Sequence, residues 1–282
     1  MKPSITALFL IALTSLPAAS RAQLPSIQEL DERLRAVEQQ LGIGGQKPVP
    51  TIGVANKQWQ LTLADEFSAA ALDGAKWSPK YFWTPTVING ELQDYFPDQL
   101  KLADGMLKIR CDAPQRDGGR YRSGVISSFG KFSQAYGFFE VRLKWPAGPG
   151  TWPTVWLYPE DRKWPPEIEI FEANGYKPRL TWPNYHWTVG GKQQADPTYF
   201  DAGVDLTADF HVYSVLWQPG LLVWYLDGRE IKRLTGEHVA SKPMHINLNL
   251  AVAPPGNAGM PTPDGTTKFP CELEIDYVRV WK

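Results

Sequence analysis

The stretch VYSVLWQPGLLVWYLDGREIKRL, residues 212–234, decides the fold class of this chain. It contains three short apolar-rich runs, 212–217, 221–226 and 230–234, which are separated by Pro219-Gly220 and by Asp227-Gly228. An Asp-Gly pair between two strand-like runs is typical of a two-residue type I′ hairpin turn. The stretch therefore predicts a three-stranded antiparallel meander.

The same alternation of apolar and polar residues continues on both sides of the meander. The apolar positions are Phe139, Val141, Leu143 and Trp145 in one run and Leu273, Ile275 and Tyr277 in another. Such alternation predicts strands with one buried face. Short strands interrupted by Gly and Pro fill residues 59–282, so we expect one all-β domain, a sandwich or a barrel, without an internal repeat.

The first 22 residues are predicted to be an export signal. Lys2 precedes an apolar stretch, 5–16, that is too short to span a bilayer, and Ser20 and Ala22 are small residues at the expected cleavage positions. A membrane anchor is the alternative. With no other apolar span, the mature chain is expected to be secreted or periplasmic, where disulfides are permitted.

Residues 23–45 are predicted to form a short helix of coiled-coil type. The apolar residues at its two seam positions are Ile27, Leu30, Leu34, Val37 and Leu41. Because residues 33–38 resemble a pattern associated with parallel trimers, one interpretation is a homo-oligomer, a trimer, formed through this helix. The other is an amphipathic helix docked on its own domain. Residues 46–58, with two prolines, read as a linker into the β domain.

Composition excludes several partners and cofactors. Lys and Arg number 29 against 30 Asp and Glu, without a long basic run, so nucleic acid is not an expected partner. Four His and two Cys lack metal-ligand spacing, and no loop clusters enough acids for calcium, so neither a metal nor another cofactor is predicted. The chain has 12 Trp, which suggests a role beyond core packing.

The chemistry concentrates in PPEIEIFE, residues 165–172. Alternation places Glu167 and Glu169 on one strand face, and a β-bulge at Ile170-Phe171 would return Glu172 to that face. Glutamates at the two ends of this row could bring their carboxyls to the roughly 5 Å separation of a retaining glycosidase. A merely polar outer strand face is the alternative interpretation of the same pattern.

At this point the sequence resembles glycoside hydrolase family 16 over nearly all of residues 59–282. The resemblance is carried, in order, by DEF (65–67), NGELQ (89–93), YRSG (121–124), YGFFEVR (136–142), GTWPTVWL (150–157), EIEIFE (167–172), WYLDG (224–228), LNLAV (248–252) and DYVRV (276–280). It implies a β-jelly roll of two curved antiparallel sheets, a polysaccharide substrate bound on the concave face, and retaining hydrolysis.

The resemblance also implies roles for the three carboxylates. Glu167 corresponds to the nucleophile and Glu172 to the general acid/base. Glu169 stands where most members have Asp, and its role would be to orient and tune the nucleophile. Val125 is a second departure, because many members carry Arg there. A β-1,3 or mixed-linkage glucan is the expected substrate, and a bacterial exopolysaccharide or galactan is the alternative.

Further residues are expected to contact the sugar, because pyranoses pack on aromatic rings beside polar groups. By motif position these are Asn89, Trp152, His186 and Asn249. Trp164, Trp182 and Trp187 are weaker candidates, for which core or loop packing is the alternative. Trp145, Trp156, Trp217, Trp224 and Trp281 are expected in the core.

Two alternatives stay open at the level of the sequence. A lectin-like binding protein on the same fold, or a transglycosylase, would share these motifs. Cys111 and Cys271 have the same inward parity in their strands, which predicts a disulfide if those strands are neighbours and two buried free thiols otherwise.

Overall fold

The structure, a computed structural model, describes residues 50, 58–83, 88–256 and 259–282. The chain divides into two units, residues 1–47 and 48–282, and the described residues belong to the second. The export signal, the helix at 23–45 and most of the segment 46–58 lie outside the described residues, so those three assignments stay predictions. The sequence expectation of an all-β domain is confirmed for the described part.

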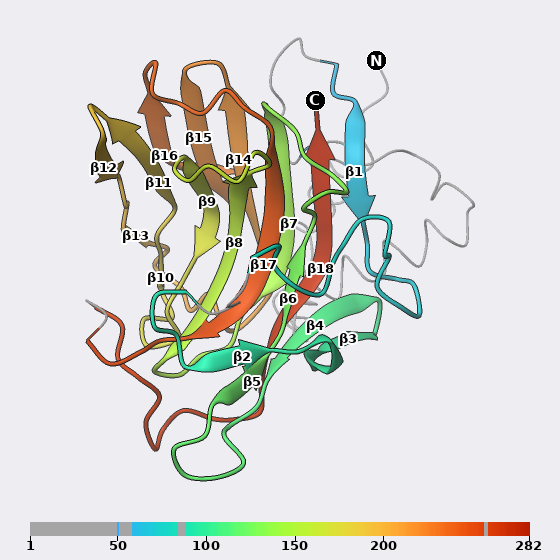
Figure 1. Cartoon of the computed structure of the whole chain (residues 1–282), viewed down its shortest axis with the longest axis vertical. Helices are drawn as coiled ribbons and strands as arrows, with labels where there is room; N and C mark the ends of the chain where they lie inside the picture. Colours follow the sequence, from blue (N-terminus) through green and yellow to red (C-terminus); the bar gives the residue numbers. More distant parts are fainter. Residues whose placement is uncertain (1–49, 51–57, 84–87, 257–258) are drawn as a thin grey trace, which may run out of the picture. The chain divides into compact units, whose positions relative to one another are not determined.

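Two large antiparallel sheets form the domain (Figure 1). The larger sheet has the order β16 (Arg229–Thr235), β15 (Leu221–Leu226), β14 (His211–Gln218), β7 (Gly137–Lys144), β18 (Cys271–Trp281), β4 (Met106–Cys111) and β3 (Leu100–Ala103), with β1 (Leu61–Asp65) also pairing with β18. The smaller sheet has the order β12 (Lys192–Ala195), β11 (Asn184–Val189), β9 (Glu167–Glu172), β8 (Thr151–Pro159), β17 (Met244–Val252) and β6 (Val125–Ser127).

Shorter elements complete the domain. β10 (Leu180–Thr181) pairs antiparallel with β13 (Phe200–Asp201), and β2 (Gln93–Tyr95) pairs parallel with β5 (Tyr121–Ser123). A single 3₁₀ turn, η2 (Pro97–Gln99), precedes β3. Within the ranges that the structure describes, no helix has the length and apolar character needed to cross a bilayer.

The predicted meander is confirmed as β14, β15 and β16. Asp227 and Gly228 join the last two strands with φ angles of 49° and 78°, the left-handed values that a type I′ turn requires at both positions. This hairpin ends one side of the larger sheet (Figure 1).

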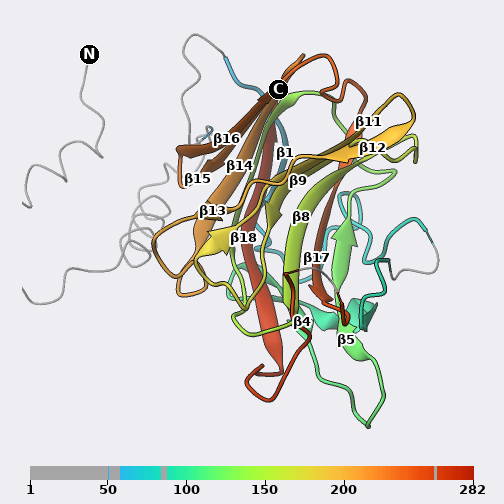
Figure 2. The ribbon, with the colours of Figure 1, turned by 90° about the vertical axis from the view of Figure 1, so that its left-hand side faces the viewer.

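The core lies between the two sheets, which Figure 2 shows as separate layers with β8, β9 and β11 on one side of β14, β15 and β18. The apolar residues of both inner faces meet there, because each strand alternates its side chains between two faces. Trp145, Trp217 and Trp224 are fully buried in this core, as expected. Trp281 is also buried, but in a second cluster with Phe138 on the other face of the larger sheet.

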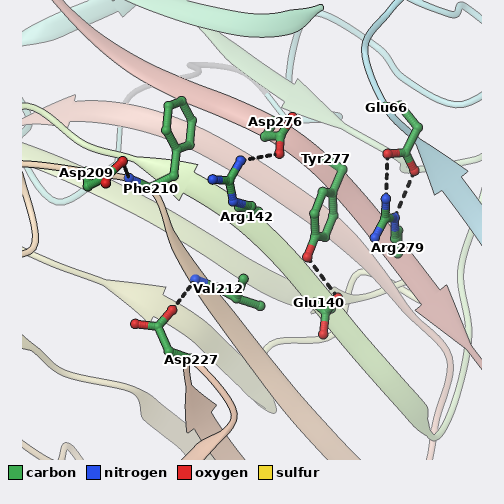
Figure 3. A network of polar contacts seen from close by, with 10 residues as sticks. All are labelled: Glu66, Glu140, Arg142, Asp209, Phe210, Val212, Asp227, Asp276, Tyr277 and Arg279. Atoms are coloured by element: carbon green, nitrogen blue, oxygen red, sulfur yellow. Dashed lines mark hydrogen bonds and ion pairs between the residues drawn. The ribbon is translucent and has the colours of Figure 1, made fainter. Parts of the chain in front are cut away.

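One predicted alternation is wrong at its end. Leu273 and Ile275 do face the core, but the register with β7 shifts between Ile275 and Tyr277, so Tyr277 turns to the outer face. There its hydroxyl donates to Glu140 Oε1 at 3.0 Å (Figure 3). The bulge lets a buried phenol meet a buried carboxylate, which alternation alone would have kept on opposite faces.

Polar pairs continue along this outer face, beside Tyr277. Arg142 donates to Asp276 Oδ2 at 2.6 Å, and Arg279 donates two hydrogen bonds to Glu66 (Figure 3). Because every partner is charged and hydrogen-bonded, these half-buried groups avoid the cost of desolvation without compensation. The network therefore fixes β1, β7 and β18 together behind the core.

Cys111 and Cys271 lie directly opposite each other on β4 and β18. The predicted condition, that their strands are neighbours, is therefore met. Both are free thiols in the structure, Cys111 buried and Cys271 half-buried. The disulfide itself stays a prediction.

Candidate active site

The three glutamates of β9 share one face because the strand contains the predicted bulge. Opposite Val155 and Trp156 of β8, the partners on β9 are Phe171 and Glu169, so Ile170 is the extra residue. Ile168, Ile170 and Phe171 are buried in the core. The bulge therefore returns Glu172 to the face of Glu167 and Glu169, as the out-of-phase sequence required.

This face of the smaller sheet forms the floor of a cleft of about 990 Å³. The sequence-predicted residues Asn89, Trp152, Trp164, Glu167, Glu169, Glu172, Trp182, His186 and Asn249 all line it. They come from β8, β9, β11 and β17, from the segments just before β9 and β11, and, for Asn89, from the segment before β2. Trp187 is the exception, because its ring stacks on Tyr185 and His238 away from the lining.

Each outer carboxylate accepts a hydrogen bond from an indole. Trp164 Nε1 donates to Glu167 Oε2 at 2.6 Å, and Trp152 Nε1 donates to Glu172 Oε1 at 2.7 Å. An indole N–H is a donor only, so it favours the ionised form of its partner and fixes the direction of the carboxyl group. The two tryptophans thus orient both ends of the row.

Burial raises the pKa values of all three carboxyls, and neighbouring negative charges add to it at Glu167 and Glu169. Burial raises the pKa of Glu167 to about 7, with the charge of Glu172 adding to it. Burial also raises the pKa of Glu172, against the indole hydrogen bonds. Glu169 is affected most, since burial and then the negative charges of Glu172 and Glu167 hold its pKa well above the usual range. Such a row keeps protons at neutral pH, which general acid catalysis requires.

Glu169 lies between the two catalytic candidates on β9. It is 8% exposed, and Trp224 Nε1 of the opposite sheet donates to its backbone oxygen at 2.7 Å. Its Oε1 lies 3.9 Å from His186 Nε2. The backbone of the middle residue is therefore anchored to the core while its carboxyl remains among the other two.

His186 contacts the carboxylate row from β11, which pairs it with Glu167. Asn184 Nδ2 and His186 Nε2 are 3.0 Å apart, so with the amide as donor Nε2 carries no proton. Burial, and to a lesser extent Lys232, lowers the pKa of His186. A neutral imidazole at this place is a polar neighbour of Glu169 rather than its counter-ion.

Asn249 of β17 is held by three partners. Its Oδ1 accepts from Thr154 Oγ1 at 2.7 Å and from Trp156 Nε1 at 2.8 Å, and its Nδ2 donates to Tyr95 at 3.1 Å.

The prediction for Trp156 is wrong, because this residue is buried on the cleft face and not in the core between the sheets. β8 is a central strand with both faces covered, so apolar character could not tell the two faces apart.

Two features of the cleft were not singled out by sequence reasoning. Glu91, within the NGELQ motif, is 4% exposed, lines the cleft and accepts from Gln93 Nε2 at 2.6 Å, while burial raises its pKa to about 7. Tyr199 lines the cleft with 66% of its surface exposed. The motif could have identified Glu91, but Tyr199 lies in a loop without a pattern.

Val125 is buried beneath an aromatic group. Tyr81 and Trp156 pack on it, and the ring of Trp83 stacks on Tyr81 with centroids 4.3 Å apart. Where the resemblance leads one to expect a cation, this cleft therefore has an apolar, aromatic wall.

The described residues also group three possible metal ligands. Glu167, Glu169 and His186 each offer an atom, and these atoms lie within 4.8 Å of one another. Two of these residues belong to the carboxylate row, and the third, His186, lies beside it. The expectation that no metal is needed stays a prediction from the sequence.

A two-sheet β-sandwich that carries a row of buried glutamates in an aromatic cleft defines a carbohydrate-active protein of the retaining glycosidase kind. Residues 91–278 match the family model described as glycosyl hydrolases family 16. The chain belongs to this family, whose members are retaining endo-β-glycosidases.

Similar proteins agree with this membership. A beta-glucanase of Rhodothermus marinus is 30% identical over 79% of this chain and 85% of its own length. An endo-1,3-1,4-beta-glycanase of Rhizobium meliloti is 33% identical over 78% of this chain and 51% of its own length. The chain thus spans about half the length of the first curated relatives it matches. The X-ray structure of an endo-beta-1,3-glucanase from Pyrococcus furiosus, 31% identical, covers 83% of this chain and 98% of its own, with a TM-score of 0.71.

Proposed function

We propose that the protein is an endo-acting retaining glycoside hydrolase that cleaves an uncharged β-1,3 or mixed-linkage β-1,3-1,4 glucan. The observation that carries the proposal is the pair Glu167 and Glu172, on one face of a bulged strand, each oriented by an indole N–H. A sugar-binding module without turnover has no need of buried carboxyls whose pKa values are raised.

The proposed reaction has two steps. Ionised Glu167 attacks the anomeric carbon and forms a glycosyl ester, while the bond to the leaving oxygen breaks and that oxygen takes the proton of Glu172. Glu172, now ionised, then removes a proton from water, whose oxygen attacks the same carbon and releases Glu167. The raised pKa of Glu172 supports its protonated starting state. The product keeps the configuration of the substrate.

The charge of the cleft favours an uncharged polymer. Four glutamates line it, and the described lining residues include neither Lys nor Arg. The nearest candidate, Lys232, is buried and donates to the backbone oxygens of Pro183 and Asp196. A sulfated or carboxylated polysaccharide would meet repulsion without a compensating cation. The names of the glucanase relatives agree with this preference.

The test is a reducing-sugar assay on laminarin and lichenan, with carrageenan as the anionic comparison. The wild-type protein should release oligosaccharides from one or both glucans, and Glu167→Gln should abolish release while it leaves the fold and glucan binding intact, because the amide cannot form the ester. Glu237→Gln, at an exposed glutamate outside the cleft lining, is the matched control. Full activity of Glu167→Gln would refute the assignment.

We further propose that the protein is exported and that residues 1–22 are removed. The apolar stretch at 5–16 and the small residues Ser20 and Ala22 support this proposal. Mass spectrometry of the protein recovered outside the cytoplasm should give an N-terminus near Gln23. A full-length mass would contradict it.

We also propose that residues 23–45 assemble copies of the chain, as a trimer. The support is the seam of Ile27, Leu30, Leu34, Val37 and Leu41. Light scattering should show the mass of an oligomer for residues 23–282 and that of a monomer once 23–45 are deleted. If both proteins have the same number of chains per particle, the result would favour a helix that docks on its own domain.

A further inference from the structure

We propose that Trp182 and Tyr199 form a binding subsite for the sugar unit on the leaving-group side of the scissile bond. This inference rests on the proposed function, since it needs Glu172 to be the group that protonates the leaving oxygen. The ligand is the apolar face of an uncharged pyranose. The argument depends on where the two rings lie, how they are held and why one of them is exposed.

Trp182 is tied to Glu172 and not to Glu167. The Trp182 backbone N–H donates to the Glu172 backbone oxygen at 3.0 Å, and Thr181 Oγ1 donates to the same oxygen at 3.0 Å. The Trp182 side chain is also among the groups that lower the pKa of the Glu172 carboxyl, which burial raises. The unit that leaves with the protonated oxygen must lie next to the acid, and therefore next to Trp182.

Tyr199 extends this contact outward along the cleft. Its ring centroid lies 5.9 Å from that of Trp182, with the ring planes inclined at 45°. Trp182 is 6% exposed, whereas Tyr199 is 66% exposed, and both line the cleft. An exposed aromatic ring beside a buried one at the rim of a cleft is suited to a ligand that needs an apolar face and water at its edges.

The backbone that carries the two rings is fixed before any ligand arrives. β10 and β13 pair Thr181 with Phe200, so Trp182 and Tyr199 are the next residues of the two strands. Thr198 N–H donates to Pro183 O at 3.2 Å, and Lys232 Nζ donates to the same oxygen at 3.2 Å. Lys232 Nζ also donates to Asp196 O, at the start of the Tyr199 segment. A pre-ordered platform loses little entropy on binding, so its contacts count fully toward affinity.

The opposite side of the carboxylate row is built from other residues. Trp164 donates to Glu167, and the wall of Tyr81 and Trp83 belongs to the part of the cleft that also holds Glu91. Burial raises the pKa of Tyr81 well above its usual range and the charges of Glu91 and Glu167 add to it, so this wall lies near Glu167. The Trp182–Tyr199 platform therefore affects the leaving sugar and leaves recognition of the transferred sugar to the other side.

The test measures kcat/KM of the Tyr199→Ala variant on two substrates. One is the glucan, which places a sugar on the leaving side, and the other is a β-glucan oligosaccharide with a nitrophenyl leaving group, which does not. We expect kcat/KM on the glucan, relative to that on the nitrophenyl substrate, to fall about tenfold, because the sugar loses its contact with the aromatic ring. Tyr199→Phe, which keeps the ring, should restore the ratio.

Tyr176→Ala is the matched control, since Tyr176 is 57% exposed and is not among the lining residues. It should leave the ratio unchanged. An equal loss on both substrates, or no loss, in Tyr199→Ala would overturn the subsite while leaving the proposed function intact. If the wild type cleaves neither substrate, the proposed function fails. The subsite is then decided separately by calorimetry, which measures the binding of the same glucan oligosaccharide without its nitrophenyl group. Binding to Glu167→Gln should weaken about tenfold when Tyr199→Ala is added; unchanged or undetectable binding contradicts the subsite.

Discussion

Trp152 Nε1 lies 2.7 Å from Glu172 Oε1, so an indole N–H points at the carboxyl that must hold a proton before catalysis. This hydrogen bond favours the ionised form and opposes burial, which raises the pKa of Glu172. In the proposed reaction the same residue has to be an acid in one step and a base in the next. The indole therefore limits how high the pKa rises, and allows Glu172 to serve in both steps.

Replacing Trp152 with Phe should raise the pKa of Glu172, because the variant loses the donor while the site stays buried. Activity requires protonated Glu172, so the basic limb of the kcat/KM profile should move to higher pH by about one unit, the effect of one hydrogen bond to a charged group. The measurement is a pH profile on a soluble glucan. An unshifted basic limb would mean that Glu172 is not the acid, or that the indole does not bond to it.

Trp164→Phe should act on the opposite limb. Trp164 Nε1 donates to Glu167 Oε2 at 2.6 Å, and its loss should raise the pKa of Glu167 above about 7. Because the nucleophile must be ionised, the acidic limb should move to higher pH. The shift should be smaller, about half a unit, since Trp164 is 41% exposed and water can replace its hydrogen bond. Each tryptophan variant controls for the other, and a shift of the same limb in both would contradict the assigned roles.

The carboxylate row shows which features of the site could be predicted from the sequence alone. Glu172 is out of phase with Glu167 and Glu169, and one inserted residue is the local way to bring it back, so the bulge at Ile170 could be predicted. The bulge before Tyr277 could not be predicted in this way, because Tyr277 is in phase with Leu273 and Ile275 in the sequence. Its bulge serves a partner, Glu140, that is 137 residues away in the chain. Contacts across strands distant in sequence decide such positions, and a single sequence does not reveal them.

The tryptophans show the same limit. Trp145 and Trp156 have similar apolar neighbours in the sequence, yet one lies between the sheets and the other in the cleft. Position in the cleft depends on which face of β8 meets the loop carrying Tyr81 and Trp83, which local alternation does not determine. Motif resemblance located Trp152, whereas Tyr199, in a segment without a motif, emerged only from the fold.

Glu169→Asp should change activity without abolishing it. The shorter side chain moves the middle carboxyl away from its neighbours, so the hydrogen bonds from Glu169 that lower the pKa values of Glu167 and Glu172 should weaken. We expect a kcat altered by a few-fold and a pH optimum moved toward higher pH, because Glu167 would ionise less easily. Kinetics over pH 4–9 would check this, and identical profiles would mean that position 169 does not influence the pair.

Glu169→Gln tests the same residue through stability. The folded-state pKa of Glu169 lies above its unfolded value, so its protonated form stabilises the fold fully below about pH 4.5, and this stability is lost as pH rises toward the folded pKa. The amide carries no charge at any pH. The variant should therefore gain thermal stability relative to wild type at pH 8 and not at pH 4, by roughly 2–4 °C per kcal/mol. Melting curves at both pH values decide it, and a constant difference between the proteins would show that charge at this position is not the cause.

Oxidation should join Cys111 and Cys271, which are directly opposed on β4 and β18. A bond between them would close a loop of about 160 residues, and the chain-entropy account gives roughly 4–5 kcal/mol for loops of that length. Mild oxidation should remove both free thiols in a thiol titration, lower the mass by two hydrogens and raise the melting temperature, and reductant should reverse all three changes. Cys111→Ser with Cys271→Ser should melt at one temperature in both conditions. Thiols that stay titratable after oxidation would show that the pair remains reduced, as the structure has it.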